Sequence, residues 1–239
     1  MAKKPQDQRL FDQWDKWIGL IYQDFQELVI RRHVYEEVRK IIQTNPRLHK
    51  PSSFYDFMQA TFSAFAALSV RRQSEASARR LLDSVKQHPE ILSRERFVET
   101  YTSKMLAGFA GHEPVEEHVT SSGGAYMPSA AEVSEIASKT FDQYVGPGAP
   151  HVDPAQVRAE LDELRAKAKR LEHLADKRIA HLTDEPTEIP TLPELDSFIE
   201  TFERIVHKYM MILRASAPVQ VLPSWQYDWK AIFKEPWIP

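Results

Sequence analysis

The sequence has no cysteine among its 239 residues and only seven glycines. The absence of cysteine excludes disulfide bonds, thiolate metal ligands and a thiol nucleophile, and it suits a cytoplasmic protein. No apolar run approaches the ~18 residues that a membrane span needs, and none follows the N-terminal lysines as it would in a signal peptide. The formal net charge of −3 gives no overall attraction to nucleic acid, so a polyanion site has to be a local basic patch.

Helix-breaking residues are concentrated in one region, because six of the seven glycines lie between residues 108 and 148. Strand signals are weak, with no sustained alternation of Val, Ile and Thr and no Asn-Gly or Asp-Gly hairpin turn. We therefore expect an all-α fold: one helical domain over 1–217 with a flexible insertion at about 108–152, and an aromatic C-terminal strap over 218–239. Apolar spacing predicts helices from Phe11 to Ile41 and over 54–73, 76–88, 93–107, 131–144, 153–182 and 191–215.

The helix predicted over 153–182 has one charged edge. At about 100° per residue its apolar positions fall in one sector. Beside that sector lie five basic side chains, which are Lys167, Arg170, Lys177, Arg178 and His181. A histidine can transfer a proton near neutral pH, and an arginine can stabilise a phosphoryl oxyanion. These side chains can equally extend around the rim of a helical bundle, so spacing alone leaves a catalytic and a structural interpretation open.

Other catalytic and metal-binding patterns are missing from the sequence. There is no phosphate-binding glycine loop, no nucleophile elbow and no pair of histidines with carboxylates at metal-ligand spacing. We accordingly expect neither a metal nor a cofactor.

Several short motifs together resemble a known superfamily. Residues 176–181 read Asp-Lys-Arg-Ile-Ala-His and are followed by a proline-containing loop and Thr-Leu-Pro-Glu-Leu. Further matches are the paired arginines in 69–73, Arg-Leu-Leu at 80–82, and Tyr-Asp-Trp-Lys-Ala-Ile-Phe with Pro-Trp within 227–237. In this order they resemble the HEPN superfamily (higher eukaryotes and prokaryotes nucleotide-binding), and in particular its abortive-infection branch.

The resemblance implies a helical bundle that dimerises and acts as a metal-independent endoribonuclease of a toxin or anti-phage system. His181 would be the acid/base group and Arg178 the phosphate ligand. The RNA would be bound by auxiliary basic side chains, which are Lys167, Arg170, Lys177, Arg71 and Arg72. In the superfamily motif an arginine precedes the histidine across about four to six intervening residues. The matching positions 174–176 carry no arginine here, so a non-catalytic module that dimerises or binds RNA or nucleotide is the alternative. RNA, a second copy and an antitoxin or another defence protein are the expected partners, and a membrane is not.

Two further features are left with two interpretations each. Arg71 and Arg72 can contact phosphate or form structural salt bridges. The tail tryptophans Trp225, Trp229 and Trp237 can stack on bases, but we favour a strap that closes the hydrophobic core.

Overall fold

The computed structural model describes residues 5–48, 53–110, 128–174 and 191–235. Regular secondary structure in this part of the chain is helical, apart from an isolated bridge between Ser93 and His151, which confirms the all-α prediction. The helices are α1 (Gln6–Thr44), α2 (Ser53–Arg71), α3 (Ala78–Gln87), α4 (Arg94–Ala110), α5 (Ala130–Val145), α6 (Pro154–Leu174) and α7 (Leu192–Arg214). None of the described helices combines the length and the apolar character that crossing a membrane requires.

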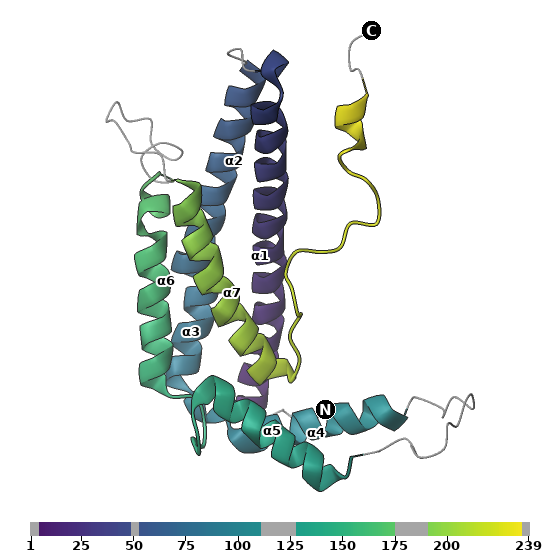
Figure 1. Ribbon diagram of the computed structural model, residues 1–239. Coiled ribbons are helices and arrows are strands. Elements are labelled where there is room, and N and C mark those ends of the chain that lie inside the picture. Colours follow the sequence, from purple (N-terminus) through teal and green to yellow (C-terminus); the bar gives the residue numbers. More distant parts are fainter. Residues whose placement is uncertain (1–4, 49–52, 111–127, 175–190, 236–239) are drawn as a thin grey trace, which may run out of the picture.

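Helices α1, α2, α3, α6 and α7 form an elongated bundle (Figure 1). A π-helical stretch, η2 (Arg72–Ser77), joins α2 to α3, so that the two helices continue one another. Aromatic side chains fill the space between α1 and α7: Phe25 packs edge-on against Phe202 at 5.0 Å between ring centroids, and Phe198 lies 5.5 Å from Phe202. All three rings are fully buried, and each contributes about 2–3 kcal/mol of hydrophobic free energy.

Helices α4 and α5 pack against each other across one end of the bundle (Figure 1). Phe141 of α5 is completely buried and lies 5.5 Å from the ring of Phe97. The Arg94 guanidinium donates a hydrogen bond to the carbonyl of Ala149 (3.0 Å) and pairs with Asp142. Because these buried and hydrogen-bonded contacts join α5 to α4, the described part of the 108–152 region packs against the rest of the fold.

The two helices nearest the histidine motif begin as the sequence predicts. The Asp153 carboxylate accepts a hydrogen bond from the backbone N–H of Ala155 (2.9 Å) at the start of α6. Thr191 and Glu194 form the capping box of α7, in which the Thr191 backbone N–H donates to the Glu194 carboxylate at 2.7 Å. The described part of α6 ends at Leu174, so the predicted continuation to residue 182 lies outside the described residues.

A buried ion pair joins α6 to α7. Lys208 Nζ lies 2.6 Å from one carboxylate oxygen of Glu160, and the Tyr209 hydroxyl donates to the other at 2.8 Å. The charged side chains are each only 6% exposed. Burial, and then the Glu160 charge, raise the pKa of Tyr209 well above 10, so this hydroxyl remains a hydrogen-bond donor.

The chain after α7 turns back and runs along α1 (Figure 1). Gln26 donates to the Val221 carbonyl (3.1 Å), Lys230 pairs with Glu37, and the ring of Trp229 lies 6.4 Å from that of His33. Val221 is buried, whereas Trp229 is only half-buried. The described part of the tail thus contacts α1 through polar side chains as well as through an aromatic ring.

Candidate functional site

Only part of the predicted catalytic set can be placed in the structure. Lys177, Arg178 and His181 lie outside the described residues. The other four predicted residues are described, two of them on α6 (Lys167 and Arg170) and two where α2 meets the π-helical stretch (Arg71 and Arg72).

Arg71 and Arg72 both form ion pairs. Arg71 Nε lies 3.0 Å from the Glu75 carboxylate one helical turn away, and Arg72 Nε lies 2.9 Å from Asp24 of α1. Asp24 also accepts a hydrogen bond from Gln73 Nε2 (3.0 Å), so this carboxylate fastens the start of η2 to α1. These contacts favour the structural salt-bridge interpretation of the two arginines.

The described basic residues have different ion-pair partners. Arg170 pairs with Glu194, the capping residue of α7, and thereby links the end of α6 to the start of α7. Arg72 instead contacts α1, and Lys167 is exposed to solvent on α6. Of the described cations, Arg72 and Arg170 thus form ion pairs that join two helical segments.

The π-helical stretch contains an unusual buried polar cluster. Ser69, Gln73 and Ser74 are all at least 98% buried. Ser74 Oγ donates to the Val70 carbonyl (2.9 Å) and contacts Glu172 near the end of α6. Ser69 Oγ and Gln73 Oε1 have no hydrogen-bond partner among the described residues. Such π-helical insertions occur often at functional sites, and this one was not predicted from the sequence.

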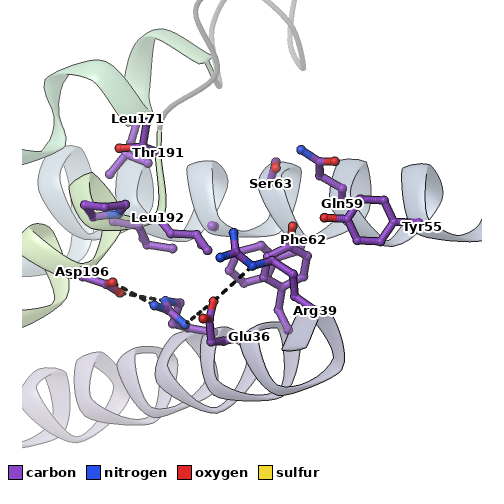
Figure 2. A pocket seen from close by; sticks show the side chains of 15 residues that line it. Glu36, Arg39, Tyr55, Gln59, Phe62, Ser63, Leu171, Thr191, Leu192 and Asp196 are labelled. Carbon is purple, nitrogen blue, oxygen red and sulfur yellow. Dashed lines mark hydrogen bonds and ion pairs between the residues drawn. The ribbon is translucent and has the colours of Figure 1, made fainter. Parts of the chain in front are cut away.

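A cleft of about 500 Å³ opens between α1, α2 and the first turn of α7 (Figure 2). Helix α1 contributes Arg32, Tyr35, Glu36 and Arg39 to its wall, and α2 contributes Tyr55, Gln59, Phe62 and Ser63. Leu171 and Thr191 also line it, so the two described segments that flank residues 175–190 both end beside this cleft.

Four charged side chains form the polar wall of the cleft. Asp196 accepts two hydrogen bonds from Arg32, at 2.7 and 2.8 Å, and this pairing raises the pKa of Arg32. Glu36 Oε2 lies 3.6 Å from Arg32 and 3.7 Å from Arg39 Nε, which is close enough for an ion pair but too far for a hydrogen bond. Both Glu36 Oε2 and Arg39 Nε are buried and make no hydrogen bond with the described residues.

Aromatic rings form the apolar wall. Tyr35 and Phe62 stack at 4.2 Å between centroids with an angle of 7° between their planes. Tyr55 projects from α2, and its hydroxyl lies within hydrogen-bonding reach of the Tyr35 hydroxyl (Figure 2). Burial, and then the neighbouring Tyr55, raise the pKa of Tyr35 above 10, so this phenol stays neutral. Tyr35 and Phe62 also line a second, apolar groove of about 330 Å³ in which Phe54 and Phe57 are exposed.

The sequence contained a signal for this cleft that the motif search missed. Arg32, Tyr35, Glu36 and Arg39 recur at three- and four-residue steps, which places them on one face of α1. Charged groups at this spacing within an otherwise apolar helix face indicate a polar contact or a binding site.

The cleft brings charged and aromatic side chains of α1, α2 and α7 together. Among the described residues no cluster of three or more histidine or acidic side chains could hold a metal ion. No protein-family model, no curated protein and no solved structure matches this chain.

Proposed function

We propose that this protein is a metal-independent endoribonuclease of the toxin or anti-phage defence type, in which two copies form the catalytic groove. The observation that supports it best is the position of the cleft, which lies beside Leu171 and Thr191, ten residues before and ten residues after His181 in the sequence. A cleft lined by arginine and aromatic side chains gives RNA a place to bind, and the described segments on either side of the histidine motif both reach it.

The proposed reaction is an internal transfer of the phosphate. The 2′-hydroxyl oxygen attacks the neighbouring phosphorus, the bond to the 5′-oxygen of the next nucleotide breaks, and a 2′,3′-cyclic phosphate and a 5′-hydroxyl result. His181 moves the proton from the 2′-hydroxyl or to the leaving oxygen, and Arg178 stabilises the charge on the phosphate. Removal of one such charge-stabilising donor costs about 3 kcal/mol of transition-state stabilisation, or roughly a hundredfold in rate.

The test is cleavage of a panel of RNAs by the purified protein in the presence of EDTA. His181→Ala should abolish cleavage, and Arg178→Ala should slow it by about a hundredfold. His173→Ala and Arg158→Ala are matched controls, because both side chains are exposed on the described part of α6. Expression should arrest growth unless His181 is replaced, and light scattering should give the mass of a dimer. Cleavage that needs a divalent metal, or that survives His181→Ala, would refute the proposal.

The second candidate is a non-catalytic scaffold that dimerises or binds RNA or nucleotide. It is favoured by the ion pairs of Arg71 and Arg72, which hold two arginines that could otherwise replace the missing motif arginine. A folded dimer that binds RNA but cleaves none, and a His181→Ala variant without phenotype, would establish this alternative.

A further inference from the structure

The charges in the cleft are balanced, and this limits the kind of ligand it can hold. Its wall carries two arginines, Arg32 and Arg39, and two carboxylates, Glu36 and Asp196. Arg32 and Asp196 satisfy one another through two hydrogen bonds. A small anion such as inorganic phosphate would meet Glu36 as well as Arg39, and the repulsion from the carboxylate would offset the attraction to the guanidinium. The balance favours a neutral polar ligand.

Glu36 and Arg39 also bring an acceptor and donors to the wall of the cleft. Glu36 Oε2 and Arg39 Nε form a buried ion pair at 3.7 Å, and the two side chains keep 20% and 35% of their surface exposed through their other atoms. A ligand that offers a donor beside an acceptor can hydrogen-bond with the accessible carboxylate oxygen and guanidinium N–H groups. The pairing edge of a nucleobase has this arrangement, with an N–H next to a carbonyl or a ring nitrogen.

The other wall suits the flat face of such a ring. Tyr55 and Phe62 lie two turns apart on α2, and both line the cleft together with Arg39 (Figure 2). Gln59 and Ser63 lie between and beside them and add hydrogen-bonding groups. A volume of about 500 Å³ lies within the usual range for small-molecule sites, and stacking on aromatic rings is how proteins commonly hold bases.

We propose that this cleft binds a single nucleobase, whose ring lies against Tyr55 and Phe62 and whose pairing edge is recognised by Glu36 and Arg39. The assignment rests on the proposed function only in naming RNA as the molecule that supplies the base. A free nucleotide carries the same base, so the ligand is a nucleobase whichever of the two molecules supplies it. Binding of a base can be measured without any cleavage.

The experiment is calorimetric titration of the full chain with the four ribonucleosides, their 5′-monophosphates, inorganic phosphate and a short oligoribonucleotide. Nucleosides should bind about as tightly as the monophosphates, with a preference among the bases, and inorganic phosphate should not compete. Tighter binding of the oligonucleotide assigns the base to RNA, and equal binding assigns it to a free nucleotide. Phosphate that binds as tightly as the monophosphates, or nucleosides that do not bind, would overturn the proposal.

Two substitutions in the cleft locate the site. Glu36→Gln and Tyr55→Ala should each weaken nucleoside binding by about ten- to a hundredfold, through the loss of a charged hydrogen bond and of a stacking ring. Glu27→Gln is the matched control for the first, because Glu27 is exposed on the same helix, and Tyr227→Ala is the control for the second, because Tyr227 is exposed in the tail. Melting curves establish that each variant is folded. An equal loss in variant and control would refute the assignment of the cleft.

The titrations separate this inference from the proposed function. If nucleosides bind through Glu36 and Tyr55 but no RNA is cleaved, base binding stands and the ribonuclease proposal fails. If RNA is cleaved but nucleosides do not bind and Glu36→Gln cleaves like the unmodified protein, the ribonuclease proposal stands and base recognition in this cleft fails.

Discussion

Replacement of Lys208 by methionine tests the buried contact between α6 and α7. Lys208 and Glu160 are each 6% exposed and 2.6 Å apart, and Tyr209 completes the group by donating to the second carboxylate oxygen. Lys208→Met keeps the length and apolar character of the side chain but leaves the Glu160 carboxylate in the core with a single neutral donor. An uncompensated buried charge of this kind costs about 3–5 kcal/mol of unfolding free energy.

A second substitution should recover part of this loss. In the double variant Glu160→Gln with Lys208→Met no buried charge remains, and the glutamine oxygen still accepts the hydrogen bond from Tyr209. We expect the double variant to be more stable than Lys208→Met alone, with a coupling free energy of about 1–3 kcal/mol between the two sites.

The assay is urea unfolding followed by far-ultraviolet circular dichroism, with the unfolding free energy taken from linear extrapolation. Asp162→Asn is the control, because Asp162 and Arg158 form an exposed pair on the same helix, with side chains 60% and 76% exposed. That substitution should change the stability by no more than about 0.5 kcal/mol. If Lys208→Met costs no more than Asp162→Asn, or if the two core substitutions add without coupling, the pair is not desolvated and the reasoning is wrong.

Two further predictions concern the α4–α5 hairpin and the tail. Arg94→Lys should lower the unfolding free energy by about 1–3 kcal/mol, because one ammonium cannot reproduce the three hydrogen bonds of the guanidinium. These bonds go to Ala149 (3.0 Å), Ser138 (3.3 Å) and Asp142. An effect no larger than that of Lys139→Ala, whose side chain is exposed, would contradict this prediction. Hydrogen bonds from Lys230 and then Lys40 lower the pKa of the Glu37 carboxyl from 4.5 to about 2. The ionised carboxylate therefore stabilises the docked tail fully above pH 4.5, and this stabilisation is lost as the pH falls through about 2. Tryptophan fluorescence should report tail release in that acid range, and a titration curve identical to that of Lys230→Ala would refute the link.

The sequence determined the helices because their signals are local. Apolar side chains at three- and four-residue steps predict α1, α2 and α7, and the capping box at Thr191 and Glu194 marks the start of α7 to the residue. The scarcity of glycine outside one region and the weak strand signals were enough to predict an all-α fold. Each of these inferences uses residues within a few positions of one another.

The same local rules say less where partners are distant. Glycine content predicted a flexible insertion over 108–152, but it did not show that Phe141 packs against Phe97 or that Arg94 bonds to the chain at Ala149. Arg71 and Arg72 allowed two interpretations in the sequence, and only the positions of Glu75 and Asp24 in space favour one of them.

The partners of the charged residues in the cleft and in the buried ion pair were decided by tertiary structure. Arg32 meets Asp196 across 164 residues of sequence, and Lys208 meets Glu160 across 48. The spacing of charged residues in α1 indicates a polar contact or a binding site, but nothing within one helical turn of these residues shows which distant partner each will find. The choice of partner depends on how α1, α6 and α7 pack. Packing depends on the fit between whole helix faces, and the spacing of residues within a single helix does not specify that fit.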